Sequence, residues 1–343
     1  MSATRILTCR ASGSPNLIQV LSLGKQVLTG VFPRTVDQYV STGPLDLVWC
    51  PDSGLLQLAH SFDPNEMYGD SYGYRSGLNG SMVRHLTHKA SYLERLVELS
   101  SGDVVLDIGS NDATSLKAYQ TSGIKRIGID PTGKKFANYY TDGIVLVPDF
   151  FSAKRFLAIS PKQAKIISSI AMFYDLEDPV DFARQVAEVL ARDGVWHFEQ
   201  SYMPSMLRTC AYDTICHEHL EYYSLGVVKR IVEEAGLRLL DVQMNSVNGG
   251  SFAVTAAHTG SIYKANEVMI DWMMGQEDRM GLNTPAPYRD FEERVFRHRQ
   301  DLKRLLEMLA GDGKRVLGYG ASTKGNVTLQ FCGIGTKLIG AIA

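Results

Sequence analysis

The stretch Val104-Val-Leu-Asp-Ile-Gly-Ser-Asn-Asp-Ala-Thr-Ser-Leu116 decides the fold of this chain. Its apolar first half predicts a buried strand, which delivers Asp107 and Gly109 to a tight turn before a helix that begins near Thr114. Ligands of open parallel sheets bind outside the carboxyl ends of the strands, where a glycine lets the backbone approach the ligand closely. The stretch therefore predicts a ligand-binding edge.

Strand and helix patterns alternate after this stretch. Apolar strand patterns occur at residues 126–130, 144–147, 164–169, 195–200, 237–242 and 252–257, and helical patterns include 179–191 and 227–235. Repeated strand-helix units predict a Rossmann-like, doubly wound α/β sheet with mainly parallel strands and right-handed crossovers. The last of these strands is expected at an edge of the sheet.

The regions before and after the predicted sheet have different sequence patterns. Short strand patterns predict a small β-rich N-terminal domain at residues 1–80, after which the sheet domain covers residues 81–262. Residues 263–343 are predicted to form a C-terminal α/β domain, with a charged helix at 287–309 and a strand that enters a glycine turn at 318–326. Because the chain stops near its next strand, we expect this domain to be incomplete.

The charge balance limits the classes of partner. The chain has 35 basic and 37 acidic residues and a formal net charge of −2, which argues against a nucleic acid or a membrane surface and favours a small molecule. No apolar run of about 18 residues occurs, and the first residues lack an apolar signal core. We therefore expect a cytoplasmic protein that acts as a monomer.

Two short stretches near the N-terminus repeat one pattern. Cys9-Arg-Ala-Ser12 and Cys50-Pro-Asp-Ser53 each place a cysteine three residues before a serine at a predicted turn. Two complete Cys-x-x-Cys knuckles at these places would hold zinc with four thiolates, but serine is a poor zinc ligand. We expect Cys9 and Cys50 to pack in a small core without a metal; a degenerate zinc site at these two cysteines is the alternative.

The turn after the opening strand departs from the dinucleotide fingerprint Gly-x-Gly-x-x-Gly. Asn111 and Ala113 stand where that fingerprint would have glycine, so a pyrophosphate could approach less closely. Asp107, Gly109 and Asn111 instead present an acid and amides to the ligand. Such a turn suits a ligand with a cationic amino-acid end.

The next two strands also end in acids. Asp130 lies 23 residues after Asp107, as expected of one strand-helix-strand step, and a carboxylate there can accept both hydroxyls of a ribose. Asp149 and Phe150 end the following strand, where an acid can accept an adenine amino proton while the ring stacks. The arrangement resembles class I S-adenosylmethionine-dependent methyltransferases.

That resemblance assigns roles along the predicted sheet edge. It implies that Gly109 and the turn after it hold the methionine end of S-adenosylmethionine and that Asp130 holds the ribose. It also implies that Asp149 and Phe150 contact the adenine. Ala171 falls within the family's fourth motif, beside the methyl group that is transferred.

A second candidate site is the run Tyr212-Asp-Thr-Ile-Cys-His-Glu-His-Leu-Glu-Tyr-Tyr-Ser-Leu225. If the run is extended, His217 and His219 share one face and Glu218 points to the other. Histidine suits proton abstraction near neutral pH, whereas the spacing does not match the His-Glu-x-x-His pattern of zinc proteases. The alternative is a pair of hydrogen-bonded core histidines beside tyrosines.

Two glycine-rich segments contain further candidate binding residues. Tyr68, Tyr72 and Tyr74 lie between glycines and polar residues, where they could line a pocket or belong to a domain connector. The turn Gly318-Tyr-Gly-Ala-Ser-Thr-Lys-Gly-Asn326 fits a phosphate cradle to which Lys324 adds charge. The alternative for the turn at residues 318–326 is an ordinary connection between a strand and a helix.

Together these features resemble the three-domain sugar C-methyltransferases that act on nucleotide-linked 4-keto-deoxysugars, the group with the tetronitrose and kijanose pathway enzymes of antibiotic biosynthesis. The resemblance covers the whole chain, and Cys216-His-Glu-His-Leu-Glu-Tyr-Tyr223 is its most specific part. It implies that His219 is the base that removes a proton beside the ketone, that Glu218 contacts the sugar and that Tyr72 is the pocket tyrosine. Tyr68 and Tyr74 are alternatives for the role of pocket tyrosine. The other candidate substrate contacts are Cys216, Tyr222 and Lys324. His217 is a further candidate catalytic residue.

The chain also departs from that family. The family has complete zinc knuckles where this chain has serines at positions 12 and 53, a tyrosine at the position of Cys216 and a glycine at that of Ala113. Its chains normally continue past residue 343. Two alternative functions therefore stay open: O- or N-methylation of a small molecule, and a catalytically impaired protein that binds S-adenosylmethionine or a sugar nucleotide.

Overall fold

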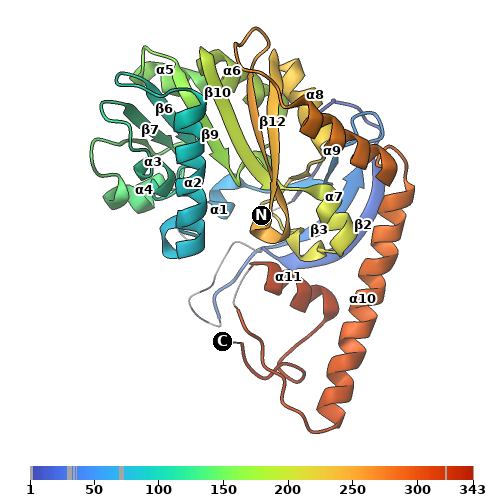
Figure 1. Ribbon diagram of the computed structural model, residues 1–343. Coiled ribbons are helices and arrows are strands. Elements are labelled where there is room, and N and C mark those ends of the chain that lie inside the picture. The colour runs from blue at the N-terminus through green and yellow to red at the C-terminus, as the bar shows by residue number, and fades with distance from the viewer. Residues whose placement is uncertain are drawn as a thin grey trace. The chain divides into compact units, whose positions relative to one another are not determined.

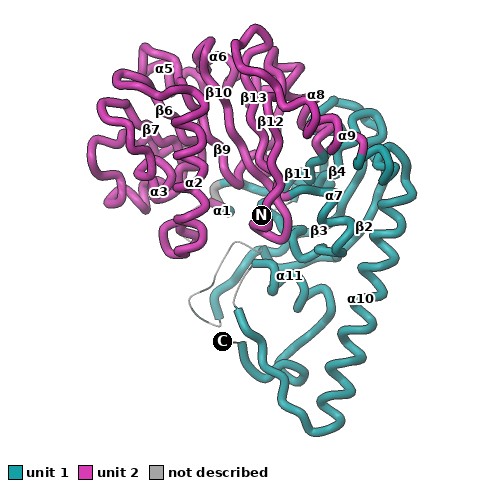
Figure 2. The backbone as a smooth tube through the Cα atoms, viewed as in Figure 1, with its two compact units in different colours: residues 1–67, 202–224, 276–343 teal, residues 68–201, 225–275 magenta. Residues whose placement is uncertain are grey.

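The computed structural model describes residues 3–28, 33, 35, 37–68, 73–320 and 323–342, and in this part of the chain it forms two compact units (Figures 1 and 2). Unit 1 comprises residues 1–67, 202–224 and 276–343, and unit 2 comprises residues 68–201 and 225–275. The units group segments that pack together, so each contains pieces distant in sequence. The division into domains at 1–80, 81–262 and 263–343 stays a prediction.

Unit 2 is built on a sheet that has seven strands within the described residues, in the order β12-β13-β10-β9-β6-β7-β8. Its strands are β6 (Val104–Ile108), β7 (Lys125–Ile129), β8 (Val145–Val147), β9 (Ala164–Ile170), β10 (Leu190–Ser201), β12 (Leu237–Asn245) and β13 (Ser251–His258). The strands from β10 to β8 pair in parallel, which confirms the doubly wound α/β sheet. This sheet brings the ends of β6, β7 and β8 to one edge.

The prediction that the last strand lies at an edge is wrong. β13 pairs antiparallel with both β10 and β12, and β12 is the edge strand. The short helical turn η5 (Val247–Gly249) reverses the chain after β12, so that β13 runs back beside it. Almost every residue of β13 is buried, as expected of an interior strand.

Helices cover both faces of this sheet. In β10, Trp196 lies 6.1 Å from Phe182 of α6 (Pro179–Val189) between ring centroids. The next residue, His197, points the other way and lies 6.0 Å from Tyr92 of α2 (Gly80–Leu96), which crosses in front of the sheet in Figure 1. Burial on both faces explains the near-continuous apolar strand patterns.

Most of the remaining helical elements of unit 2 are one or two turns long. They are η1 (Ser76–Leu78), α3 (Thr114–Lys117), α4 (Gly133–Phe136), η2 (Ala137–Tyr139), α5 (Ala153–Ile159), η3 (Phe173–Asp175), α8 (Leu225–Glu234) and the start of α9 (Glu267–Met280). The helix predicted near Thr114 is confirmed as α3, a single turn.

Unit 1 contains an antiparallel sheet of four strands among its described residues, in the order β11-β4-β3-β2. The strands are β2 (Ile18–Val27), β3 (Thr42–Trp49), β4 (Leu56–Leu58) and β11 (Glu221–Tyr222), and β1 (Thr4–Arg5) pairs separately with β5 (His60–Ser61). The short strands expected in the N-terminal region are thus present. β11 follows the His-Glu-His run, so pairing of Tyr222 with Leu56 attaches that run to the N-terminal sheet.

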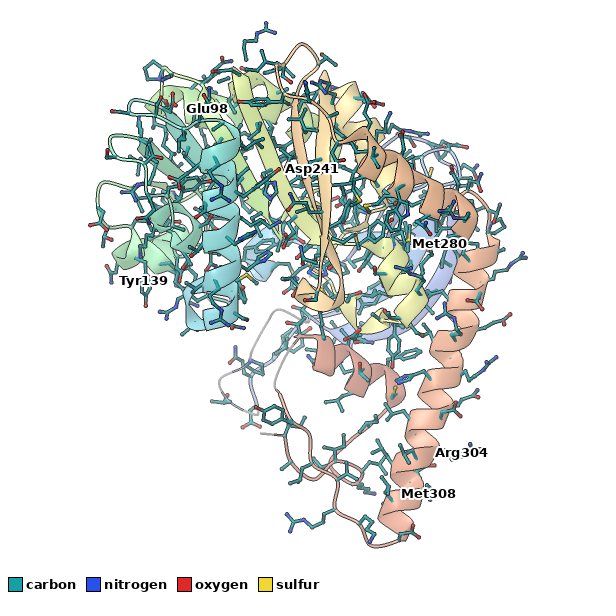
Figure 3. The ribbon with its side chains drawn as sticks, in the orientation of Figure 1. Glu98, Tyr139, Asp241, Met280, Arg304 and Met308 are labelled. Atoms are coloured by element: carbon teal, nitrogen blue, oxygen red, sulfur yellow. The ribbon has the colours of Figure 1, made fainter. Side chains whose placement is uncertain are left out.

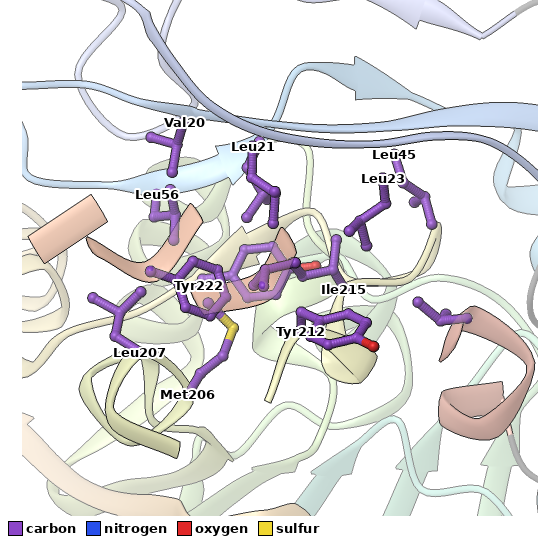
Figure 4. Close-up of a cluster of buried hydrophobic side chains, with 14 of the residues drawn as sticks. Val20, Leu21, Leu23, Leu45, Leu56, Met206, Leu207, Tyr212, Ile215 and Tyr222 are labelled. Carbon is purple, nitrogen blue, oxygen red and sulfur yellow. The ribbon is translucent and has the colours of Figure 1, made fainter. Parts of the chain in front are cut away.

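An apolar core joins this sheet to helices from the other segments of unit 1. Leu21 of β2, Leu56 of β4 and Met206 of α7 (Met203–Thr209) lie in one buried cluster (Figure 4). Trp49 stacks on Tyr288 of α10 (Ala286–Gly311) at 4.9 Å between ring centroids. Three separate segments therefore share one core.

The C-terminal part of unit 1 differs in detail from expectation. The strand predicted before the glycine turn is reduced to one parallel bridge between Gly318 and Ile342. After it comes α11 (Thr323–Cys332), and α1 (Pro64–Met67) and η4 (Tyr212–Thr214) complete the helical elements. Met308, on the last turns of α10, is 57% exposed (Figure 3). Among the described residues, no helix has both the length and the apolar character that a membrane span requires.

Candidate active site

The strand ends that were predicted to form a ligand-binding edge lie together in unit 2. Asp107 and Gly109 lie at the end of β6, Asp130 follows β7, and Asp149 follows β8. Because β6, β7 and β8 are neighbouring parallel strands, their carboxyl ends lie side by side. β9 pairs with the other side of β6, so the order of strands reverses there, at the kind of position where ligands of such sheets bind. Ala171, with a φ of 55°, is the first residue after β9.

The turn after β6 has an unusual backbone. Gly109 has a φ of +75°, and a Cβ atom there would lie 3.1 Å from Cγ of Met172, so both conformation and space favour glycine. Asn111 and Ala113 have φ values of 49° and 60°. A left-handed conformation costs about 1–2 kcal/mol for a residue with a Cβ, so Ala113 carries a strain that glycine would avoid.

Asp130 holds this turn in place. Its carboxylate accepts hydrogen bonds from the backbone N–H of Asn111 at 2.7 Å and from the N–H and hydroxyl of Thr132, both at 2.6 Å. A carboxylate offers about four acceptor positions, so these bonds leave room for roughly one more donor. The buried Asp130 therefore both shapes the turn and keeps limited capacity for a ligand hydroxyl.

Asp107 is an acid in an apolar surrounding. Burial raises its pKa to about 7, the negative charge of Asp130 adds to the rise, and a hydrogen bond from the Ser168 hydroxyl at 2.5 Å opposes it. A cationic ligand at this edge would relieve the repulsion between the two acids. Ser168 was not among the predicted site residues, although it is a serine within the apolar pattern of β9.

The end of the tyrosine-glycine segment is bonded to the same turn. The Asn111 side chain accepts a hydrogen bond from the Ser76 N–H at 2.9 Å and donates one to the Tyr74 carbonyl at 3.2 Å. The Gly77 N–H donates to Asp112 at 3.0 Å. The Asn111 side chain thus makes two bonds within the protein, and its predicted contact with the cofactor stays a prediction.

The three tyrosines of that segment have different positions. The Tyr74 side chain is 48% exposed, Tyr68 is partly buried directly after α1, and Tyr72 lies outside the described residues. Arg75, which was not among the predicted site residues, lies over the ring of Tyr139 at 4.6 Å from its centroid. Tyr139 is labelled in Figure 3. Arg75 also approaches Asp112 at 3.6 Å.

Asp149 and Phe150 are more exposed than Asp107 and Asp130, which are buried. Asp149 forms an ion pair with Arg155 at 2.7 Å, and Phe150 is 43% exposed. An exposed ring at the end of β8 is open to stacking, and the adenine contact stays a prediction.

In unit 1, the His-Glu-His run forms a turn. The His219 N–H donates to the Cys216 carbonyl at 3.2 Å, so the run is not extended and the condition for both histidines to share one face is not met. The turn gives each histidine a different carbonyl partner. Cys216 and Tyr222, predicted as substrate contacts, pack in the buried cluster of unit 1.

His219 is held as a neutral imidazole. Its Nδ1 donates a hydrogen bond to the Thr214 carbonyl at 3.0 Å, which places the proton on Nδ1 and the lone pair on Nε2. Burial lowers the pKa of His219 to about 4, the carbonyl bond opposes this, and the positive charge of Lys324 lowers it further. The residue as a whole is partly exposed. His219 thus has the protonation state of a base, and Lys324 lies within electrostatic reach.

His217 has the character of a core histidine. Its Nε2 donates to the Gly43 carbonyl at 3.1 Å, its ring meets Phe62 edge-on at 4.8 Å, and its exposed fraction is 1%. Burial lowers the pKa of His217 to about 4. Glu218, between the two histidines, is partly exposed, and burial raises its pKa to about 7 against a hydrogen bond with Cys216.

The chain is similar to known proteins along almost its whole length. The C-methyltransferase NovU of Streptomyces niveus is 31% identical over 336 residues, which are 96% of this chain and 79% of NovU. The chain belongs to this C-methyltransferase family. Family models for "Methyltransferase domain" and "C-methyltransferase C-terminal domain" match residues 82–242 and 246–343, and one for "Putative zinc binding domain" matches residues 9–68.

Solved structures with similar chain traces are more distant. An S-adenosylmethionine-dependent methyltransferase from Clostridium acetobutylicum is 10% identical, with a TM-score of 0.40 over 52% of this C-methyltransferase and 92% of that chain. The magnesium protoporphyrin IX methyltransferase of Synechocystis, solved with bound S-adenosylhomocysteine, is 12% identical, with a TM-score of 0.39 over 56% and 91%.

The family model for "Putative zinc binding domain" implies a structural zinc ion, but the residues at the two N-terminal turns of this C-methyltransferase do not fit one. A structural zinc ion takes four cysteine or histidine ligands, whereas the two N-terminal turns offer the thiols of Cys9 and Cys50 and the hydroxyls of Ser12 and Ser53. No group of three or more metal-binding side chains occurs in the portion of the chain that the structure describes.

Proposed function

We propose that this C-methyltransferase transfers the methyl group of S-adenosylmethionine to a carbon beside the ketone of a nucleotide-linked 4-keto-deoxysugar. The observation that carries the proposal is His219, a neutral imidazole whose Nδ1 proton is held by Thr214 and whose Nε2 can accept a proton. Carbon methylation needs such a base, because the carbon becomes nucleophilic only when it loses its proton to form an enolate.

The sheet edge of unit 2 fits S-adenosylmethionine. When bound, this cofactor supplies a methyl group on a positively charged sulfonium. Gly109 lets the backbone approach the amino-acid end, and the charges of Asp107 and Asp130 favour a cation there. In the proposal Asp130 also accepts a ribose hydroxyl, while Phe150 and Asp149 contact the adenine and Ala171 lies near the methyl group.

The His-Glu-His turn performs the proton transfer. His219 accepts the proton of the sugar carbon at Nε2, and the Thr214 carbonyl stabilises the imidazolium that forms, through the bond at 3.0 Å. Glu218, with a pKa of about 7, carries its proton in part of the molecules at neutral pH and can then donate to the sugar oxygen that gains charge. The charge of Lys324 attracts the diphosphate of the substrate.

The product of the reaction tests this function directly. We expect the protein, given S-adenosylmethionine and a thymidine diphosphate-linked 4-keto-6-deoxysugar, to form a C-methyl sugar whose new methyl carbon is attached to ring carbon in a carbon-13 NMR spectrum. In heavy water, the hydrogen beside the ketone should exchange. A uridine diphosphate sugar serves as the comparison for nucleotide preference. Methyl groups found only on oxygen or nitrogen would contradict the proposal.

The pH dependence of the reaction should report Glu218. An ionised carboxylate beside the developing enolate opposes its negative charge, so kcat/KM for the sugar should fall as pH rises through about 7, the pKa of Glu218. The measurement uses saturating S-adenosylmethionine, because the pKa of Asp107 is also about 7 and its ionisation favours cofactor binding. His219 stays neutral above about pH 5, because its pKa is about 4, and adds no change in that range. The Glu218→Gln variant, which is neutral at every pH, should lose the decline. A profile that rises through pH 7, or a decline that persists in the variant, would contradict this role.

A further inference from the structure

The two N-terminal turns of unit 1 have the same pattern of backbone hydrogen bonds. In the first, the Cys9 N–H donates to the Ser14 carbonyl and the Gly13 N–H donates back to the Cys9 carbonyl, each at 2.8 Å. In the second, the Cys50 N–H donates to the Leu55 carbonyl at 2.9 Å and the Gly54 N–H donates to the Cys50 carbonyl at 2.8 Å. The glycines have φ values of +68° and +80°. Both turns therefore have the form Cys-x-x-Ser-Gly.

The side chains of the two turns meet crosswise. The Cys9 thiol shares a hydrogen bond with the Ser53 hydroxyl at 3.2 Å, and the Ser12 hydroxyl lies 3.7 Å from the Cys50 sulfur. Both cysteines are buried, with exposed fractions of 2% and 0%. Cys9, Ser12, Cys50 and Ser53, which we call the Cys-Ser tetrad, are thus placed together from residues that lie 38 to 44 positions apart.

The chemistry of the Cys-Ser tetrad differs from that of a zinc site. Zinc in structural sites is held by thiolates and imidazoles, and a neutral serine hydroxyl is not among its ordinary ligands. Each serine instead bonds to the cysteine of the opposite turn. Hydrogen bonds across the turns replace the metal as the link, and the large apolar core of unit 1 supplies stability that small zinc domains lack.

We propose that the Cys-Ser tetrad is a metal-free form of a zinc knuckle pair, and that two serine-to-cysteine substitutions are sufficient to restore zinc binding. Both turns already have the same backbone hydrogen bonds, so the site lacks only two of the four thiols, at positions 12 and 53. The proposal concerns the folding of unit 1 and is independent of the substrate of the enzyme.

Zinc content tests both parts of the proposal. The full-length protein, produced with added zinc and desalted, should contain less than about 0.1 zinc per chain by plasma mass spectrometry. The Ser12→Cys/Ser53→Cys variant should contain about one zinc per chain, the stoichiometry of a four-thiolate site. Titration with cobalt should give the visible absorption bands of tetrahedral thiolate coordination in this variant and not in the parent protein.

The control has the same number of thiols in a different geometry. The Ser14→Cys/Ser53→Cys variant places one of its two added thiols two residues beyond Ser12, at a partly exposed serine that bonds to Asp52, and should bind no zinc tightly. Circular dichroism verifies that each variant is folded. About one zinc in the parent protein, lost in Cys9→Ser, would overturn the metal-free assignment. A folded Ser12→Cys/Ser53→Cys variant without zinc would overturn the claim that the turns are preformed. Should that variant fail to fold, zinc content and thermal stability of the parent protein with and without a chelator decide the first part.

Discussion

The His219→Asn variant should lose methyl transfer, with kcat about 10²- to 10⁴-fold below that of the parent protein, the usual contribution of a general base. Asparagine can still donate an amide hydrogen toward the Thr214 carbonyl, which the His219 Nδ1 now reaches at 3.0 Å, but it has no basic nitrogen. Steady-state formation of S-adenosylhomocysteine measures kcat, and calorimetry should find cofactor affinity unchanged, because none of the residues proposed to hold the cofactor is altered.

His217→Asn is the matched control for this prediction. His217 is buried against Phe62 and bonded to Gly43, so its loss should lower the temperature of unfolding and leave turnover per folded molecule largely intact. Near-normal turnover in His219→Asn, together with loss of turnover in a folded His217→Asn variant, would reverse the assignment of the base.

The Asp130→Ala variant should bind S-adenosylmethionine about 10- to 100-fold more weakly. Hydrogen bonds to a charged group contribute about 1.5–3 kcal/mol, and the substitution removes both the predicted ribose contact and the anchor of the Asn111 backbone. Calorimetric titration measures the affinity, and thermal unfolding measures the loss of stability separately.

Thr132→Val separates the two effects of Asp130. It removes the hydroxyl that bonds to Asp130 at 2.6 Å and leaves the carboxylate in place, so the affinity should fall much less than in Asp130→Ala. Unchanged cofactor affinity in a folded Asp130→Ala variant would exclude the ribose contact. An equal loss of affinity in both variants would mean that Asp130 acts only through the shape of the turn.

The sheet edge was largely predictable from local sequence. A buried strand that ends in Asp107 and Gly109, followed one unit later by Asp130, indicates a parallel sheet, because parallel strands present their carboxyl ends on one side. What each side chain does there was less predictable. Ser168 bonds to Asp107 from a position 61 residues away, and Asn111 bonds to a segment 35 residues earlier, which no local pattern reveals.

By itself, the sequence determined the class of this protein: the alternation of strands and helices, the acids at the strand ends and the His-Glu-His run are local features, and local periodicity encodes them. Tertiary structure decided the surroundings of the two histidines, while the role of His219 as the base stays a proposal. His217 finds its carbonyl partner at Gly43, 174 residues away, whereas His219 bonds to Thr214 within its own turn and keeps partial exposure. The two side chains are chemically identical, so only their burial and hydrogen-bond partners, set by the packing of distant segments, distinguish them.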